Sequence, residues 1–238
     1  RRVVFRSAWA GSQKYGALVW SGDIKSSFPS MKNQVAAGLN MGIAGIPWWT
    51  TDIGGFFGAN INDPEFHELL VRWFEYGCFC PVMRLHGYRW PLQPQYGTTG
   101  GATCVSGAPN EVWSYTDQVC EILSDYLRLR ERMLPYITEL MEEAHEKGTP
   151  VMRPLFYDFP EDKESWNVET EYMFGPKVLV KPITDADARE TDVYLPGGAS
   201  WTNAWTGETF EGGQKVHVAA PIEQIPLFTR DGYKLPMK

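Results

Sequence analysis

Several features that assign a protein to a class are missing from these 238 residues. No apolar run approaches the roughly 20 residues that a membrane helix needs. No stretch is rich in Lys or Arg, and the net charge of −7 offers no positive surface for a polyanion. The sequence therefore predicts neither a membrane protein nor a partner of nucleic acid.

Common cofactor and nucleophile motifs are also absent. The four cysteines form no CxxC pair and no Cys/His cluster at metal-ligand spacing, so we expect no zinc site, whereas a disulfide among them stays open. The glycine pairs belong to no GxGxxG or P-loop motif, which gives phosphate binding little support. The G-x-S-x-G turn of a serine nucleophile is missing too.

What the first part of the sequence contains is an alternation of short apolar runs and helical patterns. Strands are predicted at 3–5, 17–20, 42–49 and 81–85, with helices starting at Ser30 and Pro64. A long helical pattern runs from Val119 to Ala144 and is expected to bend at Pro135. This order is typical of β/α units around a parallel sheet. The four units predicted here are about half of the eight that close a (β/α)8 TIM barrel.

From residue 150 the pattern changes to short strands at 177–181, 192–195 and 215–218, separated by turns rich in Gly, Pro and Asp. We therefore predict an α/β fold in two domains: 1–149, the C-terminal half of a (β/α)8 barrel, and 150–238, a small antiparallel, sandwich-like β domain. Half a barrel leaves open sheet edges. We expect the chain to require the N-terminal half of the barrel, or to oligomerise.

Reactive groups in parallel β/α folds sit at the C-terminal ends of the strands. One polar residue follows each of the four predicted strands, in the order Arg6, Asp23, Asp52 and His86. Taken singly, each has an ordinary reading as a turn residue, a helix cap, an ion-pair partner or a structural histidine. Together, with the aromatic residues Trp20, Trp49 and Phe56 beside them, they predict one aromatic-walled polar pocket.

The motifs around these residues resemble glycoside hydrolase family 31. In chain order they are Arg6-Ser7-Ala8, Trp20-Ser21-Gly22-Asp23, the run from Trp48 to Phe56, and Met83-Arg84-Leu85-His86-Gly87. The stretches 150–155 and 172–175 resemble the junction between that family's barrel and its β domain. The resemblance covers nearly the whole chain.

The resemblance implies a retaining mechanism on α-linked sugars that requires no metal or organic cofactor. It makes Asp23 the general acid/base, which protonates the leaving oxygen and then activates the water that releases a covalent intermediate. It assigns the other six residues to sugar binding, with Arg6, Asp52 and His86 on hydroxyls and Trp20, Phe56 and Trp49 in the apolar wall. The family's nucleophile aspartate ends a strand two positions earlier in the barrel, so we expect it outside this chain.

The substrate follows from finer resemblances. Residues 50–57, 84–89 and 106–113 are most similar to α-xylosidase members, which remove α-xylosyl groups, as from xyloglucan oligosaccharides. The sequence therefore predicts a fragment of a retaining α-xylosidase, inactive by itself, in a periplasmic or extracellular rather than a cytoplasmic location. An α-glucosidase of the same family, a non-catalytic carbohydrate-binding fragment, and transglycosylation or elimination in place of hydrolysis all stay open.

Overall fold

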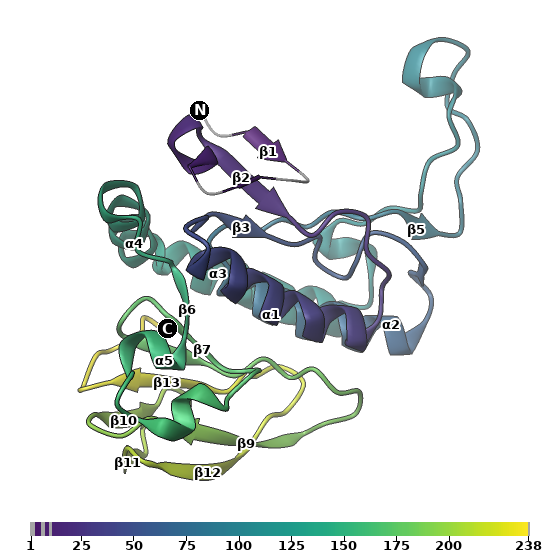
Figure 1. Ribbon diagram of the computed structural model, residues 1–238. Coiled ribbons are helices and arrows are strands. Elements are labelled where there is room, and N and C mark those ends of the chain that lie inside the picture. The colour runs from purple at the N-terminus through teal and green to yellow at the C-terminus, as the bar shows by residue number, and fades with distance from the viewer. Residues whose placement is uncertain (1–2, 6–7, 10, 238) are drawn as a thin grey trace.

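The computed structural model describes residues 3–5, 8–9 and 11–237. Its first part carries a parallel sheet of order β1-β2-β3, formed by Val3–Phe5, Ala17–Trp20 and Trp49–Thr50. Two further parallel strands, β4 (Ala59–Asn60) and β5 (Arg89–Trp90), pair with each other. Helices α1 (Phe28–Ile43), α2 (Pro64–Cys78) and α3 (Asp117–Arg132) lie beneath these strands in Figure 1.

The helix starts are set by local sequence. Ser27 precedes α1, and its hydroxyl accepts a hydrogen bond from the Ser30 amide at 3.3 Å. Asp63 precedes α2, and its carboxylate accepts from the Glu65 amide at 3.0 Å. Proline occupies the first turn of both helices, where a missing N–H breaks no helix bond. These caps fix where each helix leaves its preceding loop.

Two predicted strands are corrected by the structure. Helix α1 continues to Ile43, so the predicted strand 42–49 shrinks to Trp49–Thr50. Gly42, within the helix, packs against Pro150, since an added Cβ would come within 2.9 Å of the proline side chain. The segment 81–85 forms no regular strand and makes one parallel bridge, from Leu85 to Ile53.

At its start, the segment 81–85 has backbone groups that cannot join a ladder. The guanidinium of Arg130 donates to the carbonyls of Cys78, Cys80 and Pro81, at 2.6, 2.7 and 2.9 Å. Proline 81 itself has no N–H to donate. The segment still follows β3, because the amide of Val82 donates to the Trp49 carbonyl at 3.2 Å.

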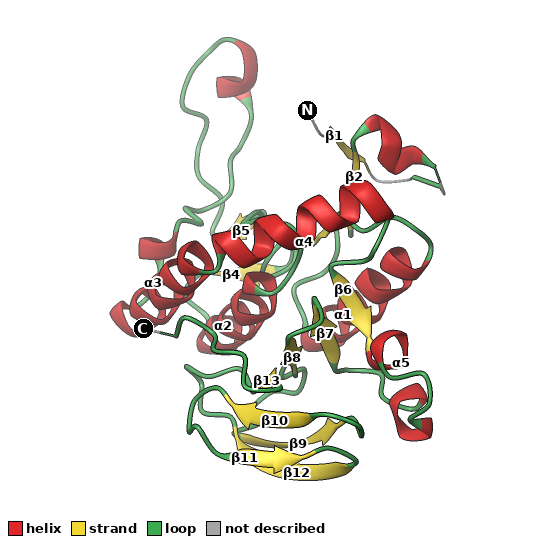
Figure 2. Cartoon of the chain, turned by 90° about the vertical axis from the view of Figure 1, so that its left-hand side faces the viewer, coloured by secondary structure: helices red, strands yellow, loops and turns green. Residues whose placement is uncertain are grey.

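The long helical pattern is two helices. Helix α3 ends at Arg132, and α4 (Leu134–Lys147) begins two residues later. Pro135 lies in the first turn of α4, so the bend predicted there is a break between helices. The two helices run in clearly different directions (Figure 2).

The C-terminal part is built from two antiparallel sheets. Six strands have the order β11-β10-β13-β8-β7-β6, and a two-stranded sheet pairs β9 with β12. Their bounds are Met152–Pro154 (β6), Tyr172–Phe174 (β7), Val178–Val180 (β8), Glu190–Leu195 (β9), Ser200–Asn203 (β10), Thr209–Glu211 (β11), Gln214–Ala219 (β12) and Leu227–Arg230 (β13). Buried residues from both sheets, among them Val193, Trp201 and Phe228, form one core. The three strands predicted after residue 150 are confirmed, in sandwich-like packing.

Short helices complete the chain. They are the α-helix α5 (Leu155–Asp158) and the 3-10 helices η1 (Ser12–Tyr15), η2 (Gly100–Thr103), η3 (Val112–Ser114) and η4 (Lys163–Trp166). Residues 91–110, which we call the arm, project away from the body with η2 near the tip (Figure 1). The arm is held as a loose hairpin by hydrogen bonds between the backbones of Gln93 and Ser106.

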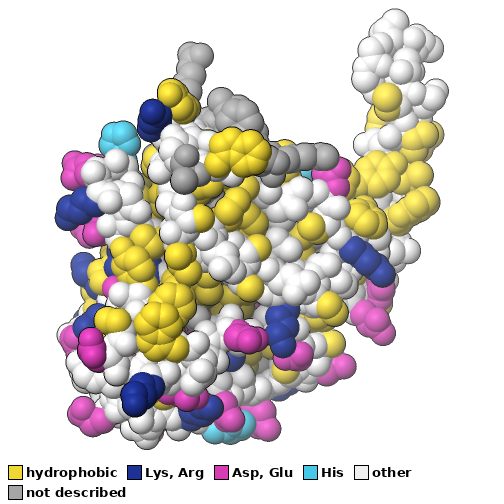
Figure 3. All heavy atoms as spheres, viewed as in Figure 1, with side chains coloured by type: hydrophobic (Ala, Val, Ile, Leu, Met, Phe, Trp, Pro, Cys, Tyr) yellow, Lys and Arg dark blue, Asp and Glu magenta, His cyan; other side chains and the backbone are white. Residues whose placement is uncertain are grey.

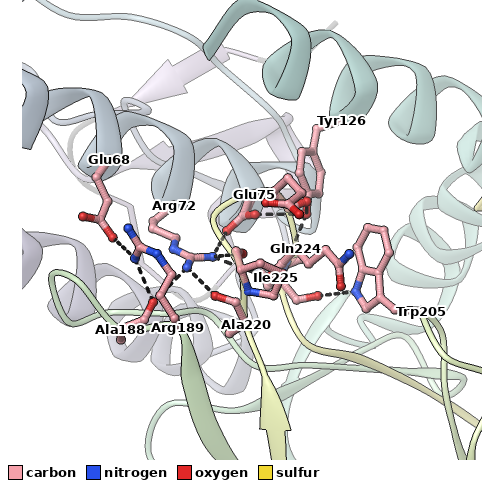
Figure 4. Close-up of polar contacts among 12 residues, drawn as sticks. Glu68, Arg72, Glu75, Tyr126, Ala188, Arg189, Trp205, Ala220, Gln224 and Ile225 are labelled. Atoms are coloured by element: carbon pink, nitrogen blue, oxygen red, sulfur yellow. Dashed lines mark hydrogen bonds and ion pairs between the residues drawn. The ribbon is translucent and has the colours of Figure 1, made fainter. Parts of the chain in front are cut away.

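A buried polar network joins the helices to the β domain (Figure 4). Arg72 of α2 is fully buried, pairs with Glu75 at 3.2 Å, and donates to four backbone carbonyls beyond residue 187. The hydroxyl of Tyr126 on α3 lies 3.1 Å from a Glu75 carboxylate oxygen and accepts from the Ile225 amide at 3.0 Å. This network fixes the two parts against each other, while the domain boundary at 149/150 stays a prediction.

Two broader features of the described residues complete the fold. No helix among them is long and apolar enough to cross a membrane. All four cysteines are free thiols, and burial raises the pKa of Cys78 and of Cys80 to about 12. Those two thiols are therefore part of the packing.

Candidate active site

Strand register decides which aromatic side chains face the site. Trp20 is paired with Thr50 and Val19 with Trp49. Since side chains alternate along a strand, Trp20 and Trp49 point to opposite faces of the sheet. Trp49 is 4% exposed and packs on α1, where a Cβ added at Gly38 would lie 2.8 Å from its indole. The predicted role of Trp49 in the pocket wall is therefore wrong, because the pleat turns it into the core.

The loops after β2 and β3 are bound to each other. The amide of Phe56 donates to the Ile24 carbonyl at 2.7 Å, and the amide of Ser26 donates to the Phe57 carbonyl at 2.8 Å. Gly55 has a φ of +76°, and a Cβ there would lie 2.6 Å from the Ser26 backbone. Only glycine fits this approach, so Gly55 keeps the two loops in contact.

Asp52 is the buried acid of this site. It is 0% exposed, and its Oδ1 accepts from Nη1 of Arg84 at 2.5 Å. Burial raises the pKa of the Asp52 carboxyl; the positive charge of Arg84 and a charged His86 oppose the rise, and the Asp23 carboxylate adds to it. Oδ2 of Asp52 has no hydrogen-bond partner among the described residues. That oxygen is buried as well, so its unmet hydrogen-bonding capacity goes with the burial that raises the pKa.

Asp23 and His86 lie on the open side of the site. Both are exposed; a charge on His86 lowers the pKa of Asp52, and a charge on Asp23 raises it. The imidazole of His86 lies 5.7 Å from the ring of Phe56, centroid to centroid, at 34°. The parallel bridge from Leu85 to Ile53 holds His86 beside the loop after β3.

Five of the seven predicted residues lie on β2, or in the segments that follow β2 and β3, and their roles stay predictions. These are Asp23, Asp52, His86, Trp20 and Phe56, the last two half-buried. The predicted Arg6 lies outside the described residues. Within the described ranges, no group of three or more His, Cys, Asp or Glu side chains could hold a metal ion.

Two arginines of the site were missed by sequence reasoning. Arg84 binds Asp52, and its Cζ atom lies 5.8 Å from the centre of the Trp20 ring. Arg89 is fully buried and donates to the carbonyls of Gly55 at 2.8 Å and Ile53 at 3.1 Å. The sequence did contain a signal for Arg84. Residues two positions apart in an extended segment point to the same side, so Arg84 is expected on the same side as His86.

Comparison with known proteins decides the family. The model of the family 31 glycosyl hydrolase TIM-barrel domain matches residues 1–140, and that of the family's C-terminal domain matches residues 148–235. The chain belongs to glycoside hydrolase family 31. The family 31 resemblance read from the strand-end motifs is confirmed, as is the fold class of barrel part plus antiparallel β domain.

Family 31 relatives with α-xylosidase and α-glucosidase names match most of the chain. An α-xylosidase of Saccharolobus solfataricus is 39% identical over 100% of this chain and 30% of its own length. α-Glucosidase 2 of Bacillus thermoamyloliquefaciens is 35% identical over 97% of this chain and 26% of its own. The crystal structure of a family 31 α-xylosidase from a soil metagenome, complexed with xylose, has a TM-score of 0.93 and 53% identity, covering 98% of this chain and 35% of that one. The chain therefore spans about a third of their length or less.

Proposed function

We propose that this chain carries the acid/base part of the active site of a retaining α-glycosidase that hydrolyses terminal α-linked xylose, as in xyloglucan-type oligosaccharides. The observation that carries the proposal is the position of Asp23. It follows β2 at the end of a Trp-Ser-Gly-Asp motif, is exposed, and its charge acts on the buried Asp52. In this proposal the exposed Asp23 transfers the proton, and the buried Asp52, bound to Arg84, serves in substrate binding.

In the proposed mechanism Asp23 acts in two steps, first as general acid and then as general base. It first protonates the glycosidic oxygen while a nucleophilic aspartate attacks the anomeric carbon and forms a covalent glycosyl-enzyme intermediate. Asp23 then removes a proton from the water that hydrolyses this intermediate. Retaining enzymes place the two carboxyls about 5 to 5.5 Å apart. We propose that the nucleophile comes from a part of the enzyme outside this chain.

The remaining site residues bind the sugar. Asp52 binds a sugar hydroxyl, and Arg84 keeps the carboxylate oriented through Oδ1. His86 reaches the sugar from the open side, and Trp20 and Phe56 cover its apolar faces. A hydrogen bond that strengthens as positive charge develops on the ring stabilises the transition state more than the bound substrate.

Xylose is proposed over glucose because relatives named α-xylosidase match the whole chain and because the xylose-complexed structure is 53% identical to it. α-Glucosidase activity is the second candidate, supported by the 35% identity to the Bacillus enzyme. The two pockets differ chiefly in the space left for the C6 hydroxymethyl group, which a few wall residues decide.

The test uses the full-length enzyme that contains this chain. We expect it to hydrolyse aryl α-xylosides with a higher kcat/KM than aryl α-glucosides, and to release the sugar with its α configuration by NMR. Asp23→Ala should lower kcat more for poor leaving groups than for activated ones. Asp185→Ala, an exposed aspartate of the β domain, serves as the control. Equal losses for both leaving groups would remove the acid/base role.

We also propose that turnover requires the rest of the barrel, supplied by the same polypeptide or by association. In this proposal the chain produced alone cleaves none of these sugars. Saturable sugar binding by the isolated chain that Asp23→Ala leaves unchanged would instead support a non-catalytic carbohydrate-binding fragment.

A further inference from the structure

A cavity lies between the arm and η3. Its volume is about 730 Å³, and its walls include Tyr96 and Ser106 of the arm, Ile61 next to β4, and Trp113 of η3. The body reaches it through β4 and β5, whose pairing continues in the hydrogen bond from the Ile61 amide to the Trp90 carbonyl at 3.0 Å. The catalytic proposal above makes no use of this cavity.

Two aromatic rings line the cavity without being packed. Tyr96 is 73% exposed and Trp113 is 75% exposed. Apolar side chains gather on the arm in the space-filling view (Figure 3). Large aromatic rings gain stability by being covered, and their flat faces suit the C–H faces of a sugar ring.

The polar groups of the cavity are held in fixed positions. Oδ1 of Asn110 accepts from Nε of Arg89 at 3.1 Å and from the hydroxyl of Tyr115 at 2.5 Å. Its Nδ2 group has no hydrogen-bond acceptor among the described residues and is left to donate to a ligand. Ser114 donates to Oε2 of Glu111 at 2.8 Å, and this hydrogen bond lowers the pKa of Glu111. A fixed amide donor and an ionised carboxylate acceptor are therefore available side by side.

Arg89 joins this cavity to the catalytic loop. The guanidinium that holds Asn110 also donates to the carbonyls of Gly55 and Ile53, in the loop that carries Asp52. The buried Arg89 therefore holds one wall of the cavity and the loop after β3 in a fixed relative position.

We propose that the cavity between the arm and η3 is an outer sugar subsite, which binds a neutral pyranose unit of the oligosaccharide beyond the unit that is cleaved. Tyr96 and Trp113 stack on this unit, while Asn110 and Glu111 bind its hydroxyls. An anionic ligand is disfavoured by the ionised Glu111. The proposal rests on the glycosidase function and adds a determinant of oligosaccharide preference.

The test compares two substrates in the full-length enzyme: p-nitrophenyl α-xyloside, which has no outer sugar, and a xyloglucan oligosaccharide with several backbone glucose units. We expect Trp113→Ala to reduce the ratio of kcat/KM for the oligosaccharide to that for the aryl xyloside by about tenfold, and Tyr96→Ala to reduce it by a smaller factor. Trp166→Ala and Tyr157→Ala replace exposed aromatics of the β domain and should leave the ratio unchanged.

Three results would overturn the proposal. An unchanged ratio in both cavity variants would show that no sugar binds there. A ratio lowered equally in the Trp166 and Tyr157 variants would assign the effect to general stability. A change of oligomeric state on Trp113→Ala, measured by light scattering, would make the cavity an interface between copies of the chain.

Failure of the glycosidase proposal is recognised separately. If the parent enzyme cleaves neither aryl xyloside nor aryl glucoside, calorimetric titration with the same oligosaccharide still tests the cavity. Binding that weakens about tenfold in Trp113→Ala supports the subsite. Binding that Trp113→Ala leaves unchanged rejects it.

Discussion

Arg84 and Asp52 form an ion pair of 2.5 Å between residues 32 positions apart in the chain. The Asp52 side chain is 1% exposed and that of Arg84 is 31% exposed, so the guanidinium connects a buried carboxylate to the open side of the site. The pair occupies Oδ1 of Asp52, while Oδ2 is buried without a hydrogen-bond partner among the described residues. Both the stability of the loop and the orientation of the acid depend on this contact.

Arg84→Ala should destabilise the enzyme by about 2 to 4 kcal/mol, because it leaves the buried Asp52 charge without a partner. The double variant Arg84→Ala/Asp52→Asn should lose less than the sum of the two single losses, since a neutral amide needs no counter-charge. Chemical unfolding of the four proteins measures this coupling. Strictly additive losses would show that the ion pair contributes nothing to stability.

Gly55→Ala should separate the loops after β2 and β3, because the new Cβ would lie 2.6 Å from the Ser26 backbone at a φ of +76°. We expect kcat to fall at least about tenfold, since a displacement of about 1 Å in a site can cost a hundredfold. Gly198→Ala is the matched control: it has a φ of +83° and open space around it, so it should cost only about 1 kcal/mol of strain. Similar kcat losses in both variants would point to strain alone.

Trp49→Ala and Trp20→Ala should behave differently although the residues stand in adjacent strands. Removing the buried Trp49 indole should destabilise the fold by about 3 to 5 kcal/mol, which chemical unfolding measures. Trp20 is half-buried beside Arg84, so its removal should chiefly raise KM for the sugar. A Trp49→Ala variant that is as stable as the parent but has a raised KM would show that Trp49 contributes to the pocket wall after all.

Glu75 should make stability fall as pH rises. Burial raises its pKa from 4.5 to about 8, despite the neighbouring Arg72. Because the folded pKa lies above the unfolded one, the stabilising contribution is complete below pH 4.5 and is lost as pH rises toward about 8. The slope is at most about 1.4 kcal/mol per pH unit from this one group.

Glu75→Gln removes this proton and should therefore flatten the pH dependence. The melting temperature of the variant minus that of the parent should increase from pH 5 to pH 8. Glu131→Gln, on an exposed position of α3, should give a constant difference over the same range. A constant difference for Glu75→Gln as well would place its folded pKa near the unfolded value.

Sequence reasoning predicted the site better than the elements that build it. Asp23, Asp52 and His86 were predicted because each follows a predicted strand, and the bridge from Leu85 to Ile53 holds the segments of the last two side by side, while the three catalytic and binding roles stay predictions. The element bounds failed where tertiary contacts intervene: the packing of Gly42 on Pro150 allows α1 to continue into a predicted strand. Arg130 binds the carbonyl of Pro81, the first residue of the predicted fourth strand.

The sequence by itself determined the family, the order of β/α units followed by antiparallel strands, and the acid/base candidate Asp23, because motifs and periodicity are local properties of the chain. Only the tertiary structure decided that Trp49 lies in the core, that Arg84 binds Asp52, and that one guanidinium, Arg89, links the catalytic loop to the arm. Those facts depend on strand register and on side chains that meet from distant segments. No pattern within one segment contains them.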